Sequence, residues 1–163
     1  MSQKIPTFDQ KNRIMSYHSL YIHIVIVVRF RAPVISAECE SHLLPYINSV
    51  ITSKNVNTLA INAALNHIHM LVEMPTDLSV ADLVRDIKRS SSLMMKNTLH
   101  VPKFFGWARE YAALSVSRAM IDRVKNYINN QKGHHRVKSF DDEFLLISGT
   151  EQTPDYYAKM FDR

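Results

Sequence analysis

The chain has 163 residues, 46% of them hydrophobic and 21% charged, with a formal net charge of +5 and a pI near 9.4. This length fits one domain with a proper core, and the near-average composition excludes a disordered chain. No apolar run is long enough to span a membrane, so a membrane protein is excluded as well. The basic charge admits a polyanionic partner without demanding one.

The cysteine content and the N-terminal sequence restrict the cellular compartment of the protein and the residue types that could bind a metal ion. The single cysteine, Cys39, excludes an internal disulfide and a thiolate zinc cluster, and it fits a reducing compartment. Residues 1–12 are polar and lack the apolar core of a secretion signal. We therefore expect a cytoplasmic protein in which any metal ion is held by histidine, carboxylate or amide groups.

The first half of the chain predicts a strand, a helix and a hairpin. Residues 16–29 are β-branched and apolar on both faces, which is typical of a central strand covered on both sides. Ser36 can cap a helix that follows, because apolar residues then recur at helical spacing as far as Ile51. Residues 57–65 and 66–75 read as two strands with a tight link, and thus as an antiparallel hairpin.

The second half predicts a helix, a strand and a final helix. Residues 79–99 carry one apolar stripe and a basic outer side, which indicates an amphipathic helix. Residues 101–107 form a loop, 110–116 a strand, and Ser117 is expected to cap the last helix. The buried side of that helix is expected to be Met120, Ile121, Val124 and Ile128.

The order strand, helix, strand, strand, helix, strand, helix matches the split βαβ unit in its first six elements. We therefore expect an α+β, ferredoxin-like (RRM-like) antiparallel sheet, with helices packed on one face and room for a site on the other. Residues 1–14 are expected to be a polar lead-in, residues 15–148 a single domain, and residues 149–163 a C-terminal tail.

Two histidines one residue apart, His67 and His69, are the first candidate site. Side chains alternate on a strand, so both imidazoles point to one face while Ile68, Met70 and Val72 point to the other. Imidazole is the commonest protein metal ligand, and a strand fixes two of them firmly. The alternative is that one histidine is a core residue and the other lies on the surface.

Tyr127 and Gln131 are the second candidate pair. They are four residues apart in the last predicted helix, so they share a face with Cβ atoms about 5–6 Å apart. That face borders the buried stripe. Tyr127 could simply anchor the helix in the core, with its hydroxyl at the edge; the functional alternative is a phenol nucleophile beside an amide ligand.

Together these segments resemble the HUH endonucleases, and specifically the single-tyrosine transposases of small bacterial insertion sequences. His67-Ile68-His69 with the following Met-Leu-Val and proline resembles the His-hydrophobic-His motif, and Tyr127 with Gln131 resembles the tyrosine helix. The resemblance covers about residues 16–144. Three further segments support it: Arg29 to Ile35, Leu83 to Ser92, and Trp107 to Ser117. One departure is Glu110, where the family often has glycine.

The resemblance implies a transposase that cuts and rejoins single-stranded DNA at hairpin-bearing element ends through a 5′-phosphotyrosine link. It implies that Tyr127 attacks the scissile phosphate and that His67, His69 and Gln131 bind a divalent ion. Magnesium or manganese is expected, with zinc as a lesser possibility. It also implies a homodimer in which the tyrosine helix of one subunit can reach the histidines of the other. No nucleotide cofactor and no membrane are expected.

Basic and aromatic residues supply candidate DNA contacts. The candidates are Arg85, Lys88, Arg89, Lys103 and Arg109, although such a basic stripe is usually just a solvated helix face. Stacking on unpaired bases or burial in the core are the alternatives for Phe104, Phe105 and Trp107. The adjacent His134 and His135 are expected to be exposed rather than to bind metal.

Two rival functions remain to be weighed. A histidine-triad nucleotide hydrolase needs a third histidine at the next alternate position, which is Leu71 here, so we discount it. The alternative within the same family is a domesticated protein that binds or nicks hairpin DNA without transposing it.

Overall fold

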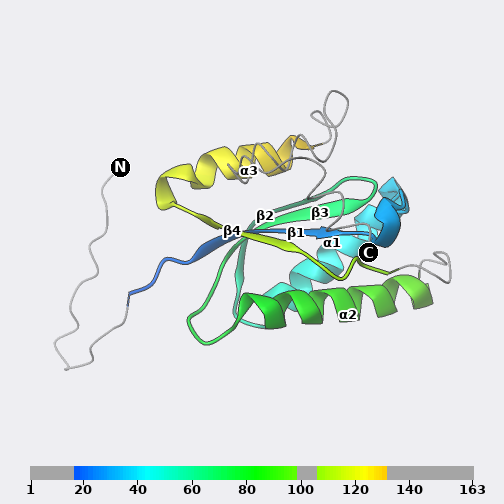
Figure 1. The fold of residues 1–163 in the computed structure, drawn as a ribbon, viewed down its shortest axis with the longest axis horizontal. Coiled ribbons are helices and arrows are strands. Elements are labelled where there is room, and N and C mark those ends of the chain that lie inside the picture. The colour runs from blue at the N-terminus through cyan, green and yellow to red at the C-terminus, as the bar shows by residue number, and fades with distance from the viewer. Residues whose placement is uncertain (1–16, 99–105, 132–163) are drawn as a thin grey trace.

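A computed structural model describes residues 17–98 and 106–131 of the chain (Figure 1). Its four strands form one antiparallel sheet in the order β2-β3-β1-β4. The strands are β1 (Tyr21–Val27), β2 (Asn57–Ala63), β3 (His67–Glu73) and β4 (Ala112–Val116). The helices are α1 (Ala37–Thr52), α2 (Val80–Thr98) and α3 (Ile121–Asn129), with 3-10 turns η1 (Arg29–Arg31) and η2 (Arg118–Met120). The predicted fold class and element order are confirmed. The predicted lead-in and tail lie outside the described residues.

The sheet is covered on both faces, but unequally. Helices α1 and α2 pack side by side on one face, where they bury the main core, and α3 crosses the other face over β2 and β3 (Figure 1). On the α3 face the apolar cluster is small, with Ala60, Leu71 and Ile128 at its centre. Two helices thus lie on one face as predicted, and the face left for the site is partly roofed by α3. No helix in residues 17–98 or 106–131 is long and apolar enough to cross a membrane.

The two predicted serine caps have different outcomes. Ser36 Oγ accepts a hydrogen bond from the Cys39 backbone N–H at 3.1 Å, so it caps α1 as expected. Ser117 makes no such side-chain bond, because the chain first forms η2 and α3 begins only at Ile121. Met120 lies in that turn and is 39% exposed, so its predicted place on the buried side is wrong.

Strand β1 is the centre of the sheet and sets the neighbours of the histidine strand. In the antiparallel register His23 lies opposite Leu71, Val25 opposite His69 and Val27 opposite His67. On the other side of β3, Asn62 of β2 lies opposite His69. Directly opposite residues share a face of the sheet, and diagonal neighbours are also within reach of long side chains. The α3 face therefore gathers polar side chains from three strands.

Candidate active site

The two motif histidines are fully inside the protein, under α3. His67 and His69 are each 1% exposed, and their ring centroids are 5.0 Å apart. The alternating Ile68, Met70 and Val72 belong to the core on the other face, so the predicted separation of faces is confirmed. The predicted alternative, with one of the two histidines on the surface, does not hold. Buried polar rings are costly unless they are hydrogen-bonded, so their partners decide what they can do.

His67 is held between Asn66 and Gln131. Its Nδ1–H donates to Asn66 Oδ1 at 2.6 Å, since an amide oxygen can only accept. The lone pair is therefore on Nε2, where Gln131 Nε2 donates at 2.7 Å. His67 Nε2, the ring nitrogen next to Gln131, is therefore the one that can bind a metal ion.

His69 is paired with a third histidine from the central strand. His69 Nδ1 lies 2.8 Å from His23 Nε2, and the two ring centroids are 5.0 Å apart. His23 is 1% exposed, and burial lowers its pKa from 6.5 to about 4, so it is neutral at pH 7. Sequence reasoning missed His23. The available signal was a polar residue within an otherwise apolar central strand.

The tyrosine helix brings the remaining groups to the histidines within one chain. The Tyr127 ring centroid lies 5.8 Å from that of His69 and 6.4 Å from that of His23, and the Tyr127 side chain is half-buried. Gln131, just beyond α3, is fully buried against His67. The two predicted pairs, 58 or more residues apart in the chain, therefore meet on the α3 face.

Asn62 of β2 fixes the end of the tyrosine helix. Its Nδ2 donates to the Ile128 carbonyl oxygen at 2.8 Å and to the Asn129 carbonyl oxygen at 3.3 Å. These carbonyls belong to the last turn of α3, where a helix leaves its carbonyl oxygens incompletely bonded; the Ile128 oxygen is also contacted by the Asn130 backbone N–H. Ile128 packs against Ala60 and Leu71 just beneath. A side chain from the sheet thus sets where Tyr127 and Gln131 stand.

The donor set fits a divalent ion that accepts nitrogen ligands. Within the described ranges, no group of three or more His, Cys, Asp and Glu side chains is arranged to hold a metal ion. Gln131 is the amide in contact with His67, so it is the side chain that could add an oxygen ligand to the histidine pair. To coordinate through oxygen, Gln131 must turn its side chain so that Oε1 replaces Nε2. Two imidazoles and an amide suit manganese better than magnesium.

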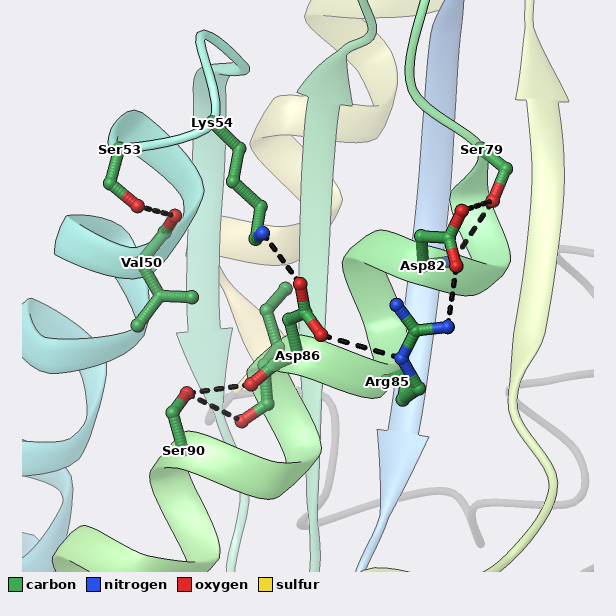
Figure 2. Close-up of polar contacts among 9 residues, drawn as sticks. Val50, Ser53, Lys54, Ser79, Asp82, Arg85, Asp86 and Ser90 are labelled. Carbon is green, nitrogen blue, oxygen red and sulfur yellow. Dashed lines mark hydrogen bonds and ion pairs between the residues drawn. The ribbon is translucent and has the colours of Figure 1, made fainter.

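Two of the basic residues of α2, Arg85 and Lys88, have partners within the protein. Arg85 pairs with Asp82 and Asp86, and Asp86 also pairs with Lys54 (Figure 2). Hydrogen bonds from Ser79 and Arg85 lower the pKa of the Asp82 carboxyl. These contacts belong to the helix surface on the face opposite the histidines.

Lys88 is engaged in a different way. Its ammonium donates to the carbonyl oxygens of Ala108, Arg109 and Glu110 at 3.0, 3.1 and 2.8 Å. Burial lowers the pKa of Lys88 to about 8. Lys88 therefore holds the chain that leads into β4.

Arg89 and Arg109 are exposed, and Lys103 lies outside the described residues. Contact of this basic group with DNA stays a prediction.

The aromatic loop has one described member. Trp107 is 6% exposed, and its Nε1 donates to Ser91 Oγ at 2.9 Å, so it is a core residue and stacking on bases is excluded for it. Phe104, Phe105, His134 and His135 lie outside the described residues. Leu71, the position that a histidine triad would need, is fully buried and apolar.

Residues 16–131 match the model of the family described as "Transposase IS200 like". The chain belongs to this IS200-like, single-tyrosine HUH transposase family. The transposase of insertion sequence IS200 from Salmonella typhimurium is 27% identical over 128 residues, covering 76% of this chain and 84% of that protein. The Salmonella typhi IS200 transposase matches equally well.

Two solved structures share the fold of this IS200-like chain. A candidate transposase from Deinococcus radiodurans R1 superposes with a TM-score of 0.58 at 23% identity, covering 76% of this chain and 98% of its own. A REP-associated tyrosine transposase bound to a REP hairpin superposes with a TM-score of 0.57 at 15% identity, covering 78% and 74%. At these identities the likeness shows the fold alone.

Proposed function

We propose that this IS200-like protein cleaves and rejoins single-stranded DNA at hairpin-bearing element ends, with Tyr127 as the nucleophile. The observation that carries the proposal is the meeting of Tyr127, Gln131 and two buried histidines on one face of the sheet. Burying these polar groups is costly for folding, so their convergence calls for a function.

The chemistry is a phosphoryl transfer with exchange of bonds. The Tyr127 oxygen forms a bond to the scissile phosphorus as the bond from phosphorus to the 3′-oxygen breaks. The phenol proton is released, and the departing 3′-oxygen takes up a proton to become a free hydroxyl. The downstream DNA remains as a 5′-phosphotyrosine, and attack by a 3′-hydroxyl reverses the step. No bond is lost to water, so no nucleotide cofactor is required.

His67, His69 and Gln131 would hold the divalent ion, which supplies charge neutralisation at the phosphate oxygens. Of these groups, the His67 ring already carries its proton on Nδ1, so its Nε2 is in the state that binds metal. The Tyr127 ring stands edge-on to the His69 ring, so its hydroxyl can approach a phosphate held at the histidines.

The partners we propose are single-stranded DNA hairpins and a second copy of this chain. A structural relative is a transposase bound to a REP hairpin, which supports the class of substrate. Of the predicted basic contacts, Arg89 and Arg109 are exposed, whereas Arg85 and Lys88 already have partners within the protein. Strands β2 and β4 are the two edges of the sheet, and an open edge can pair with another chain. A cytoplasmic location follows from the substrate.

The test is a covalent adduct on a denaturing gel. Protein mixed with manganese and a labelled hairpin oligonucleotide should give a retarded band that resists denaturation and disappears when EDTA is added first. The Tyr127→Phe variant should give no band. Tyr21→Phe is the matched control, because Tyr21 packs in the same apolar cluster on the same face. An adduct that persists in the Tyr127→Phe variant would overturn the assignment.

A further inference from the structure

Strand β1 carries a buried polar side chain that neither the sequence motif nor the proposed chemistry accounts for. His23 is 1% exposed and is followed by five consecutive buried apolar residues, Ile24 to Val28. The register sets it opposite Leu71 and diagonal to His69. Its Nε2 lies 2.8 Å from His69 Nδ1, and Tyr127 stands edge-on at 6.4 Å between ring centroids. An imidazole in this place needs a reason, because an apolar residue would pack there at lower cost.

We propose that His23 is a positioning residue that fixes the tautomer and the orientation of His69. The inference rests on the proposed function of the site. Of two neutral imidazoles in a hydrogen bond, one donates and the other accepts. If His69 donates from Nδ1 to His23 Nε2, the lone pair of His69 is on Nε2, where it can bind a metal ion.

The other motif histidine supports this assignment. Asn66 Oδ1 can only accept, so it holds His67 with the proton on Nδ1 and the lone pair on Nε2. His23 in the accepting role gives His69 the same state, and the two rings then offer the same nitrogen. Groups that orient metal-bound histidines are worth about 10- to 100-fold in metal affinity. His23 Nε2 is used in the contact with His69, so it acts through that residue.

The experiment measures manganese affinity, by electron paramagnetic resonance of the free ion, with the Tyr127→Phe protein bound to uncleaved hairpin DNA. In this background His23→Leu, which suits a buried position but cannot accept, should weaken manganese binding by about 10- to 100-fold. His23→Gln, which keeps an acceptor oxygen, should recover most of that loss. His42→Ala, at an exposed histidine of α1, should leave the affinity unchanged.

Two results would overturn the inference: a folded His23→Leu protein that binds manganese as tightly as its parent, or equal losses in the Leu and Gln variants. Thermal melting of each variant reports whether it is folded. His67→Ala in the same background separates this failure from a failure of the proposed function. If His67→Ala also leaves manganese binding unchanged, the histidine pair holds no metal at all.

A second, independent feature is the strained turn that follows β1. Phe30 has φ 59° and ψ 19°, and Arg31 has φ 50°, so two consecutive bulky residues adopt the left-handed region. Such a conformation is unfavourable for residues other than glycine and tends to be kept at functional sites. The turn nevertheless holds the Phe30 side chain 71% exposed, the largest exposed fraction among the described large hydrophobic residues.

This turn lies directly beside the candidate metal ligand. Asn66, whose Oδ1 accepts from His67, also donates from Nδ2 to the Arg31 carbonyl oxygen at 3.3 Å. The Val28 N–H donates to the Asn66 carbonyl oxygen at 2.8 Å. The exposed Arg29 guanidinium stands 5.9 Å from the Phe30 ring centroid, so positive charge and an aromatic face occur together.

The geometry points to Phe30 as a stacking platform for an unpaired DNA base next to the scissile phosphate, with Arg29 against the backbone. This too rests on the proposed function. Aromatic rings combined with basic side chains are the usual way to bind single strands, because every base has a π-face.

The test compares binding of a hairpin with a single-stranded flank and of the same hairpin without it. Phe30→Ala should weaken binding of the flanked hairpin by about 10-fold, Phe30→Trp should restore it, and the flankless hairpin should bind equally to all three. Leu93→Ala, at a residue of α2 that is 61% exposed, is the control and should have no effect. Unchanged binding in Phe30→Ala, or equal losses with both hairpins, would overturn the platform. The Tyr127 adduct assay reports separately whether the proposed function holds.

Discussion

The two faces of the sheet differ in where their polar side chains lie. On the α3 face, His23, His67, His69 and Gln131 are buried, and they form two hydrogen-bonded pairs, His23 with His69 and His67 with Gln131. On the α2 face, Arg85 and Asp86 are part of a surface chain of ion pairs that reaches Lys54 (Figure 2). Ion pairs near the surface add little to stability, whereas buried polar groups are costly and persist where chemistry needs them. The difference identifies the α3 face as the candidate site.

The largest expected effect concerns the α3 face. His67→Ala should reduce manganese-dependent cleavage by about 10³-fold, because metal assistance is worth several kcal/mol at the transition state. Hairpin affinity should change little, since phosphate contacts elsewhere supply most of it. The measurement is single-turnover cleavage alongside a binding titration. Loss of folding in this variant would instead favour a purely structural role for His67.

A smaller effect is expected at Lys88 on the opposite face, and it should appear in stability. Lys88→Met removes a charged donor from three carbonyl oxygens and should lower the free energy of unfolding by about 2 kcal/mol. Cleavage by the folded protein should stay within about twofold of the parent, because the site lies across the sheet. Chemical denaturation and the cleavage assay together give both numbers. Lys96→Met, at an exposed lysine of the same helix, is the matched control and should change neither stability nor cleavage. A loss of cleavage in the Lys88 variant would contradict the contrast between the two faces.

The smallest expected effect is that of replacing Asn62, which should alter both the stability of the protein and the position of the tyrosine helix. Asn62→Ala removes two hydrogen bonds to the end of α3, so the free energy of unfolding should fall by about 1 kcal/mol. Adduct formation should slow as well, because the turn that carries Tyr127 and precedes Gln131 loses its anchor. Asn48→Ala, at an exposed asparagine of α1, is the control. A variant with parental stability and parental adduct formation would show that Asn62 does not position the helix.

Local patterns predicted most of the fold, because they depend on neighbours in the chain. The alternation around His67 and His69 correctly predicts which side chains of the strand face the main core. Ser36 caps α1 through a hydrogen bond to a residue only three positions away. The start of α3 was missed, since nothing local distinguishes a helix from a helix preceded by a 3-10 turn. The sequence alone does not decide between stacking and burial for Trp107. Its burial depends on Ser91, a small polar residue in the apolar stripe of α2.

The sequence predicts the site residues that belong to a recognisable motif, but not the side chains that contact them from other strands. His23 contacts a residue 46 positions away, and this contact exists only because β1 and β3 pair in one particular register. Asn62 reaches α3 across 66 positions. Conversely, the sequence predicts Lys88 as a DNA contact, whereas in the structure its partners are backbone carbonyl oxygens. Every residue has a backbone carbonyl, so the sequence cannot indicate which ones a lysine will contact. Polar contacts between distant segments are therefore what the structure adds.

The central claim is tested most directly by finding which residue carries the DNA. Trypsin cuts after Lys125 and Lys132, and the peptide between these cuts contains Tyr127 as its only tyrosine. The adduct formed with manganese and hairpin DNA should be digested with nuclease and trypsin and analysed by mass spectrometry. The account predicts a 5′-nucleotide on Tyr127 of that peptide. A nucleotide on any other residue, or strand cleavage with no nucleotide attached to the protein, would contradict it.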